Sequence, residues 1–260
     1  MALFVGTSGW QYDDWSGAFY PKGIPKSRWL ECYSERFATV ESNSAFYRLP
    51  KRELFESWAD KTPADFVMSV KASRYLTHIR RLRDPAEPVH RLLERVDGLG
   101  PKRGPILLQL PPNLHFDRDL LADALSEFPD DVRVAVEVRH ESWLVEELRN
   151  ILEKHDAAFC LTDRQNRRSP LWRTATWGYV RFHEGTASPR PCYGRAALDS
   201  WAGRIASLWS ARDDVYCYFN NDTAACAPRD AHIFALAAQR HGLSPTRALS
   251  PKGDMRQASA

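Results

Sequence analysis

Cysteine is scarce in this chain and follows no metal-binding spacing. The 260 residues include five cysteines, and no two are arranged as Cys-x-x-Cys. The sequence therefore predicts neither a disulfide framework nor a structural zinc site. We expect all five to be reduced and mostly buried: Cys32, Cys160, Cys192, Cys217 and Cys226.

Long apolar runs and a strong charge of one sign are also lacking. The N-terminal stretch MALFVGTSGWQYDDW has no basic start and no long hydrophobic segment. It is therefore typical of neither a signal peptide nor a membrane anchor, and we expect a cytoplasmic protein that has no membrane partner. The 36 Lys and Arg residues nearly balance the 33 Asp and Glu residues. Only the placement of these charges, and not their sum, can indicate nucleic acid.

Three common functional motifs are absent as well. The first apolar run leads into GTSGW, which is neither G-x-G-x-x-G nor a Walker loop, so a doubly wound open sheet is only the alternative fold. No G-x-S-x-G occurs, and Cys160 lies inside an apolar run. Nucleophilic catalysis therefore has little support.

What the chain does contain is an alternation of strand-like and helix-like segments. Eight strands are expected at 3–8, 39–46, 65–71, 105–110, 134–139, 157–163, 178–183 and 215–220. Helices are expected between them at 27–37, 51–60, 87–99, 119–128, 143–155 and 196–210, with a last one at 228–240. This pattern predicts an α/β fold, a single (β/α)8 TIM-type barrel over residues 1–243. Residues 244–260 are polar without periodicity, and we expect a disordered tail.

The stretch VRVAVEVRHESW, residues 132–143, carries the strongest local signal. Valines alternate with Ala135, Glu137 and Arg139, and alternate residues of a strand point to opposite faces. If the charged face is the inside of a barrel, Glu137 and Arg139 lie near its rim, and His140 and Trp143 begin the next loop. A purely structural ion pair is the alternative.

Polar residues stand at the carboxyl ends of all eight expected strands. In a TIM-type barrel these ends converge on one mouth, where the active sites of this fold lie. We therefore predict one cavity that contains Glu41, Lys71, Glu137, Arg139, Asp163, Arg181, His183 and Asn220. Neighbouring ligand-binding residues are expected to be Asn43, Gln109, His140, Trp143 and Asn221.

These residue types favour acid–base chemistry on a small anionic ligand that carries phosphate or carboxylate. Glu137 or Asp163 would be the base and His183 or Lys71 the acid, and Glu41 is a further candidate catalytic group. Arginine forks bind such anions at two points, so Arg139 and Arg181 would clamp the ligand. We expect an enzyme, a hydrolase, lyase or isomerase, whose reaction the sequence does not determine. A non-catalytic binding protein or a polar plug is the alternative.

A metal site is a second reading of the same residues. Four of them, Glu41, Glu137, Asp163 and His183, are of types that bind divalent ions. Three cations from Lys71, Arg139 and Arg181 can balance the carboxylates without an ion, however. We therefore predict no cofactor and no metal ligand, with a divalent metal as the alternative.

Nucleic acid is a third reading. Residues 71–103 carry nine Lys or Arg against four Asp or Glu, and aromatic side chains, Trp10 and Tyr12 among them, could stack on unpaired bases near the same rim. Single-stranded nucleic acid is thus an alternative partner. The opposing reading is a solvated helix face and an aromatic lid that packs on the barrel.

Several segments together are similar to a known family. GTSGWQYDDWSGAFYP, TVESNSAFYRLP, FVMSVKASRYLTH, LLQLPPN, VEVRHESW, YVRFHEG and YCYFNND resemble the motif series of the domain of unknown function 72 family, also called YecE-like. The resemblance spans roughly residues 3–240 and implies a TIM-type barrel without an established activity. One departure is His183-Glu184-Gly185, where His-Gly is expected. At the level of fold alone, the chain resembles metal-dependent barrels such as xylose isomerases and endonuclease IV, so a nucleic-acid phosphodiesterase is a further alternative.

Overall fold

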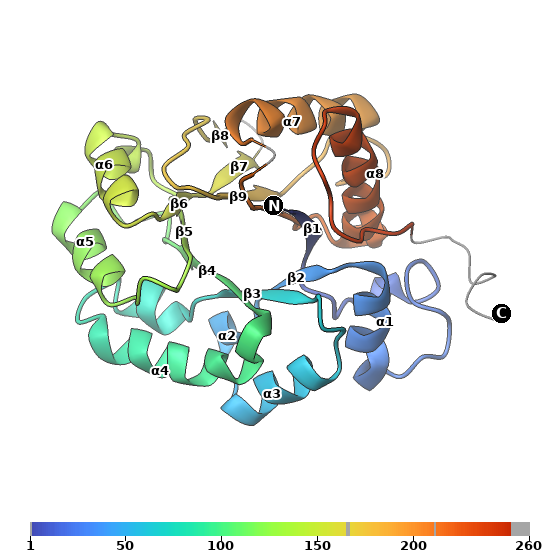
Figure 1. The fold of residues 1–260 in the computed structure, drawn as a ribbon, viewed down its shortest axis with the longest axis horizontal. Coiled ribbons are helices and arrows are strands. Elements are labelled where there is room, and N and C mark those ends of the chain that lie inside the picture. Colours follow the sequence, from blue (N-terminus) through green and yellow to red (C-terminus); the bar gives the residue numbers. More distant parts are fainter. Residues whose placement is uncertain (1, 165–166, 211, 251–260) are drawn as a thin grey trace.

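A ring of parallel strands enclosed by helices forms the molecule (Figure 1). A computed structural model describes residues 2–164, 167–210 and 212–250. The strands follow the order β6-β5-β4-β3-β2-β1-β10-β9-β7-β8. Every neighbouring pair is parallel except β7 and β8. Their bounds are β1 Leu3–Ser8, β2 Thr39–Ser42, β3 Val67–Lys71, β4 Arg103–Gln109, β5 Val134–Glu137, β6 Ala158–Phe159, β7 Leu161–Arg164, β8 Arg167–Arg168, β9 Gly178–Phe182 and β10 Val215–Phe219.

The ring closes through a strand that changes partners. β6 pairs with β5, β7 pairs with β9, and only Cys160 separates β6 from β7 along the chain. The two short strands therefore occupy a single position in the wall. Counted in this way, the wall has eight positions, and the predicted (β/α)8 barrel is confirmed.

Helices surround the ring (Figure 1). On α4, for example, Val89, Leu92 and Val96 are buried at helical spacing and face the sheet. In the described part of the chain, no helix combines the length and the apolar character that crossing a membrane requires. The bounds are α1 Trp29–Arg36, α2 Ser44–Tyr47, α3 Arg52–Asp60, α4 Ala86–Val96, α5 Arg118–Ser126, α6 Glu146–Lys154, α7 Arg195–Leu208 and α8 Cys226–Arg240, with shorter helical turns at Asp13–Trp15, Lys26–Arg28, Tyr75–Ile79, Asp97–Lys102, Glu141–Trp143 and Thr223–Ala225.

A separate cluster of side chains fills the interior of the barrel. On β5, Val134 and Val136 belong to the core between sheet and helices, whereas Ala135 belongs to the interior cluster. The alternation predicted from the sequence of this strand is thus confirmed. The interior cluster consists of Leu107, Ala135, Ala158, Cys160, Ala175, Trp177, Tyr179, Tyr216 and Tyr218. Because these side chains fill the interior, the buried charged side chains of the strands lie at their carboxyl ends.

Two predicted strands are shorter than expected. β2 ends at Ser42, where its pairing with β3 ends, and the following residues form helix α2. β5 ends at Glu137, so Arg139 lies in the loop that follows it. In both cases the strand ends where its backbone hydrogen bonds to the adjacent strand end. The residue types in the sequence do not indicate this position.

The expectation that every cysteine is reduced is wrong. Cys192, in the segment after β9, forms a disulfide with Cys226, the first residue of α8. The other three are free and buried, as predicted. The pair is separated by 34 residues and meets only because the barrel brings the two segments together. An odd number of cysteines without Cys-x-x-Cys argues against a framework of several disulfides. It does not argue against a single disulfide between residues distant in the sequence.

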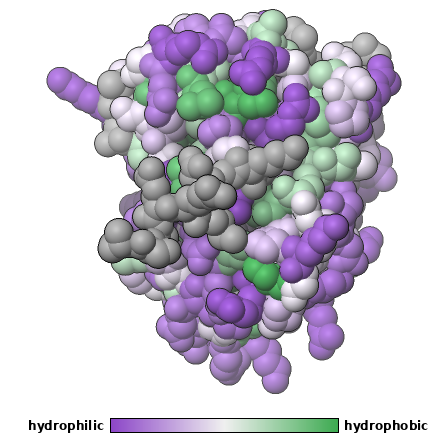
Figure 2. All heavy atoms as spheres, turned by 90° about the vertical axis from the view of Figure 1, so that its right-hand side faces the viewer, coloured by the Kyte–Doolittle hydropathy of each residue, from purple (hydrophilic) through white to green (hydrophobic). Residues whose placement is uncertain are grey.

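The beginning of the expected tail is part of the fold. Ser244 accepts a hydrogen bond from the Leu3 backbone, and Thr246 donates one back to Leu3. The Arg247 guanidinium lies 2.7 Å from the Asp65 carboxylate. Disorder from residue 244 is therefore a wrong expectation for residues 244–250, because their backbone groups bind β1 and the end of α1. Residues 251–260 lie outside the described residues. The face over α1 and α8 is mostly hydrophilic, with separate hydrophobic patches (Figure 2).

Candidate active site

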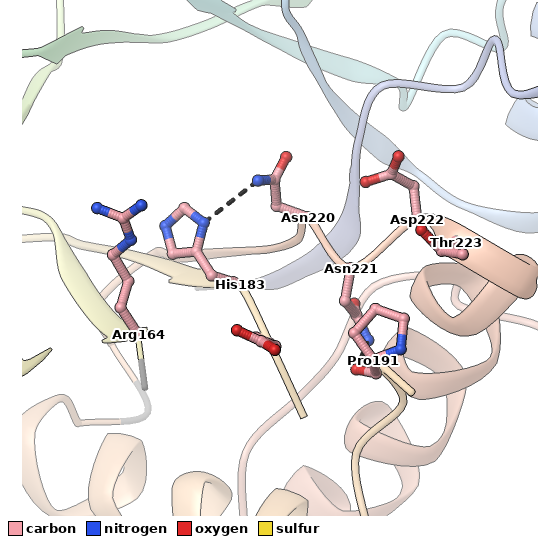
Figure 3. A pocket seen from close by; sticks show the side chains of 8 residues that line it. Arg164, His183, Pro191, Asn220, Asn221, Asp222 and Thr223 are labelled. Carbon is pink, nitrogen blue, oxygen red and sulfur yellow. Dashed lines mark hydrogen bonds between the residues drawn. The ribbon is translucent and has the colours of Figure 1, made fainter. Parts of the chain in front are cut away.

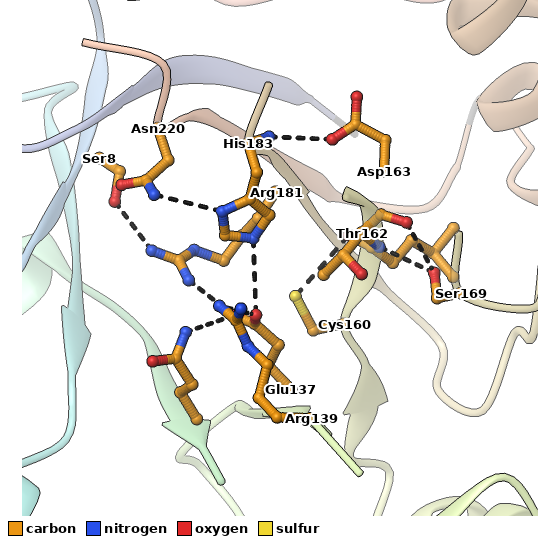
Figure 4. Close-up of polar contacts among 12 residues, drawn as sticks. Ser8, Glu137, Arg139, Cys160, Thr162, Asp163, Ser169, Arg181, His183 and Asn220 are labelled. Atoms are coloured by element: carbon orange, nitrogen blue, oxygen red, sulfur yellow. Dashed lines mark hydrogen bonds and ion pairs between the residues drawn. The ribbon is translucent and has the colours of Figure 1, made fainter. Parts of the chain in front are cut away.

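Arg181 on β9 is the centre of the polar network at the mouth. Its side chain is only 2% exposed. The guanidinium donates to Glu137 Oε2 at 2.6 Å, to Glu41 Oε1 at 2.8 Å and to Ser8 Oγ at 3.0 Å. One side chain thereby joins the ends of β9, β5, β2 and β1. Figure 4 shows its contacts with Ser8 and Glu137. Burial alone would lower the pKa of Arg181, but the two carboxylates outweigh it and raise the pKa.

Glu137 is held by cations on both oxygens. Besides the Arg181 contact, Oε1 forms an ion pair with Arg139, and Gln109 donates to Oε2 at 3.0 Å. Burial would raise the pKa of Glu137, yet Arg181, His183 and Arg139 together hold it well below its usual range. At neutral pH this carboxylate is therefore charged and weakly basic.

Glu41 has a similar anchoring role on the opposite wall. The Ser8 hydroxyl donates to Oε1, and the Tyr179 hydroxyl donates to Oε2 at 2.6 Å. Burial, reinforced by the Glu41 charge, raises the pKa of Tyr179 well above its ordinary value. Asn43 donates to Ser8 Oγ at 3.1 Å, which places it at the edge of this group as predicted.

Lys71, the last residue of β3, differs from the arginines. Among the described residues it forms no ion pair, and its ammonium lies 3.9 Å from the centroid of the Phe46 ring. Its side chain is nearly buried, at 9% exposure. Burial, with a further contribution from the Arg181 charge, lowers the pKa of Lys71 to about 8. This is the range in which a lysine can exchange a proton near neutral pH.

His183 bridges the network and the open mouth. Asn220 Nδ2 lies 3.2 Å from His183 Nδ1, and Nε2 faces Glu137 Oε1 at 3.5 Å. We assign the proton of the neutral ring to Nε2, because Nδ1 then accepts from Asn220 and Nε2 points to a carboxylate. Burial lowers the pKa of His183, against the opposing effect of Glu137. The ring is therefore neutral at pH 7.

A pocket of about 420 Å³ opens beside His183 and Asn220. Arg164, the last residue of β7, faces it from one side, and Asp222 lies toward the other (Figure 3). Burial raises the pKa of Asp222. The sequence places Arg164 in a basic segment directly after an expected strand, but Arg164 was not among the residues predicted for the cavity. Tyr179, which shares the inner face of β9 with Arg181, was not among them either.

Asp163 points away from the cavity that was predicted to contain it. Its neighbour Thr162 is the register partner of Arg181 and faces the interior. Asp163 points the other way, where it accepts from the His183 backbone at 2.9 Å and from the Tyr193 hydroxyl. Burial and the Asp163 charge raise the pKa of Tyr193. The carboxylate anchors the segment after β9 instead of facing a ligand.

Several predicted binding residues have structural roles instead. Trp143 is fully buried and donates from its indole to Leu114 O at 2.7 Å. Trp10 is buried with its ring 5.3 Å from that of Trp58, and Tyr12 donates to Ser8 O at 2.6 Å. Trp10 thus packs as part of a lid on the barrel, whereas Tyr12 is only half-buried.

Two further predicted residues lie at the edge of the site. Asn221 is 2% exposed and donates to Asp230 at 2.8 Å and to Pro191 O at 3.0 Å, so it fixes loops beside the pocket. The ring of His140 contacts that of His115, with centroids 4.0 Å apart and planes tilted by 39°. His140 also lines a different hollow of about 210 Å³, together with Arg139. Neither side chain contacts the Arg181 network directly.

The predicted metal alternative finds no suitable ligand set here. Within residues 2–164, 167–210 and 212–250, no three His, Cys, Asp or Glu side chains are grouped to hold an ion. Glu41 and Glu137 point at arginine, and Asp163 faces away from them.

The buried group around Arg181 has more positive than negative charge, whereas the described residues that line the pocket beside it include one cation, Arg164, and two carboxylates, Glu184 and Asp222. Lys71, Arg139 and Arg181 face two buried carboxylates, those of Glu41 and Glu137. The sequence predicted a balanced ring because it included Asp163. With that carboxylate outside, one cationic charge is left over, and Lys71 is the cation without an ion pair among the described residues.

Comparison with known proteins assigns the chain to a family. A model described as "Protein of unknown function DUF72" matches residues 4–254. UPF0759 protein YecE of Escherichia coli strain K12 is 31% identical, and the match covers 88% of this chain and 90% of the relative.

Solved structures agree with the fold. A DUF72 family protein from Thermotoga maritima is 27% identical with a TM-score of 0.79, covering 92% of this chain and 98% of that one. SacUVDE, at 10% identity and a TM-score of 0.57, covers 92% of this chain and 99% of its own, and it shows a shared fold alone. With the family model matched over nearly its whole length, this barrel belongs to the DUF72 family, as its sequence motifs predicted.

Proposed function

We propose that the protein is an enzyme that performs acid–base chemistry on a small anionic ligand at the barrel mouth. The observation that supports this is the unbalanced cation: Lys71 lies beside Arg139 and Arg181, while both nearby glutamates are occupied by the arginines. A phosphate or carboxylate at this position would complete the charge balance. Arg164 on the rim of the adjoining pocket would add a second contact.

The ligand position differs from the one predicted from the sequence. An anion between Arg139 and Arg181 was expected to relieve their mutual repulsion. Glu137 already does so, since it contacts both guanidinium groups. The ligand is therefore proposed to bind on the solvent side of this group, against Lys71 and Arg164.

The proton carriers follow from the local charges. Lys71, with a pKa of about 8, is mostly protonated at pH 7 and would act as the acid. His183 is neutral and would act as the base through Nδ1 once the ligand replaces Asn220 as its partner. Glu137, proposed from the sequence as the base, is better suited to orient both arginines because its pKa is low.

Turnover is the direct test. Phosphoesters, sugar phosphates and hydroxy acids would be screened with wild-type protein and Lys71→Met, with the exposed Lys154→Met as the matched control. We expect an activity that falls as the pH rises through about 8, is lost in Lys71→Met and is unchanged in Lys154→Met. Full activity in Lys71→Met would refute the proposed role. Binding of phosphate without turnover of any substrate would favour a non-catalytic binding protein.

Nucleic acid remains a second candidate, but on different grounds. The aromatic side chains after β1 that are buried, Trp10 among them, no longer support it. An observation on the neighbouring surface does favour it, and that surface forms a site of its own.

A further inference from the structure

A groove of about 460 Å³ lies beside the mouth, among α2, the turn after β3 and α4. Figure 1 shows α2, α3 and α4 on the same side of the ring. Its volume is in the range of ligand-binding clefts, ~300–1,000 Å³. Its lining includes Phe46, Tyr47, Lys51, Arg74, Tyr75 and Arg95.

The charge of this groove is of one sign. Four of its lining residues are Lys or Arg, and no Asp or Glu is among the described residues that line it. Arg91 pairs with Glu87, which lies outside the lining. In the described part of the chain, Lys51, Arg74 and Arg95 form no ion pair. A polyanion could therefore engage three cations that have no competing carboxylate.

Two exposed aromatic rings line the same groove as these cations. Tyr47 is 76% exposed and Tyr75 is 37% exposed, in contrast with the buried aromatics after β1. The guanidinium of Arg91 lies 5.6 Å from the centroid of the Tyr75 ring. Exposed aromatic rings beside cations are the combination with which proteins bind unpaired bases and their phosphates.

The groove is continuous with the candidate active site. Phe46 lines the groove and also lies under the Lys71 ammonium at 3.9 Å. Ser73 and Arg74, which line it as well, follow Lys71 by two and three residues. A ligand with one phosphate at the mouth could therefore extend outward past Phe46.

We propose that this groove binds single-stranded nucleic acid, with Lys51, Arg74 and Arg95 on successive phosphates and Tyr47 and Tyr75 on the bases. An acidic polypeptide would match the charge but would leave both tyrosine faces unused. The inference rests on the proposed function in one respect: the groove opens at the barrel mouth where the small anionic ligand is proposed to bind. Its test measures binding, not turnover, so that either can fail alone.

Fluorescence anisotropy of a fluorescein-labelled oligothymidine would test the charges. The double variant Arg74→Ala with Arg95→Ala should weaken binding about tenfold or more and reduce the slope of log affinity against log salt by about two. The matched control removes two exposed arginines elsewhere, Arg118 and Arg195, and should change the affinity by less than about twofold. Equal effects of the two double variants would overturn the proposal.

The tyrosines decide between a nucleic acid and an acidic polypeptide. Tyr47→Ala should weaken oligothymidine binding about fivefold or more, because a stacking face is lost, and should leave the thermal midpoint near that of the wild type. Labelled oligoglutamate of equal charge should bind more weakly than oligothymidine. Equally tight oligoglutamate binding, with no effect of Tyr47→Ala, would replace nucleic acid by an acidic polypeptide and overturn the proposal.

Discussion

Arg181 and Lys71 are both buried cations at one end of the barrel, yet their surroundings give them different chemistry. Arg181 donates to two carboxylates and a serine hydroxyl, so its charge is compensated and fixed in place. Lys71 lies over the face of Phe46 and forms no ion pair with the described residues, although the charges of Arg181 and Glu41 both act on it. A buried charge that lacks an ionic partner costs stability, and that cost is typical of functional sites.

The cost at Lys71 can be measured as stability. Burial lowers the pKa of Lys71 from 10.5 to about 8, so between these pH values the unfolded chain binds the extra proton and stability rises with pH. Below pH 8 the full penalty applies. Lys71→Met should therefore raise the free energy of unfolding at pH 7 by on the order of 2–3 kcal/mol.

Urea unfolding at pH 7 and pH 10 would check this prediction. The gain of Lys71→Met should shrink at the higher pH, and the exposed Lys154→Met should show no gain at either. A variant less stable than wild type at pH 7 would mean that Lys71 is a structural cation.

Glu137 has the opposite effect on stability. Glu137→Gln removes the only carboxylate paired with Arg139 among the described residues and one of the two paired with Arg181. Because this leaves buried positive charge uncompensated, the free energy of unfolding should fall by about 3–5 kcal/mol. Glu146→Gln, in an exposed pair with Arg149, should cost less than about 0.5 kcal/mol in the same urea titration. A loss below about 1 kcal/mol for Glu137→Gln would contradict the assigned network.

At the scale of the elements, alternation within strands predicted most of the site. It placed Glu137 and Arg181 inside the barrel correctly, because apolar residues flank them at alternate positions. It failed at Asp163. There the chain changes its pairing partner around Cys160, from β5 to β9, and either Thr162 or Asp163 could be the polar residue that faces the interior. Choosing the charged one selected the wrong face. The disulfide and the shortened β2 depend on tertiary contacts, which no local pattern reports.

The segment after α8 shows how an element without periodicity can still be part of the fold. Residues 244–250 make four backbone hydrogen bonds with residues 3, 36 and 38. At about 1 kcal/mol each, a chain that ends at residue 243 should be less stable than one that ends at residue 250, by about 2–4 kcal/mol. Urea unfolding of the two truncated chains compares them directly. Equal midpoints would show that these contacts contribute nothing to stability.

For the whole molecule, the charge distribution carries more information than the net charge. A net charge of +3 over 260 residues indicates no particular partner. Two adjoining regions nevertheless have an excess of cations, the mouth around Lys71 and the groove lined by Arg74 and Arg95. Both lie at the carboxyl ends of the strands, where enzymes of this fold bind their substrates.

The most direct test of the central claim is the thermal unfolding midpoint in inorganic phosphate compared with chloride at equal ionic strength. A ligand that binds only the folded state raises the midpoint, so phosphate should raise it by about 2 °C or more in the wild type. The same increase should persist in the Arg74→Ala, Arg95→Ala double variant, whose mouth is intact, and should disappear in Lys71→Met. An equal midpoint in both salts, or an undiminished increase in Lys71→Met, would contradict an anion site built on Lys71.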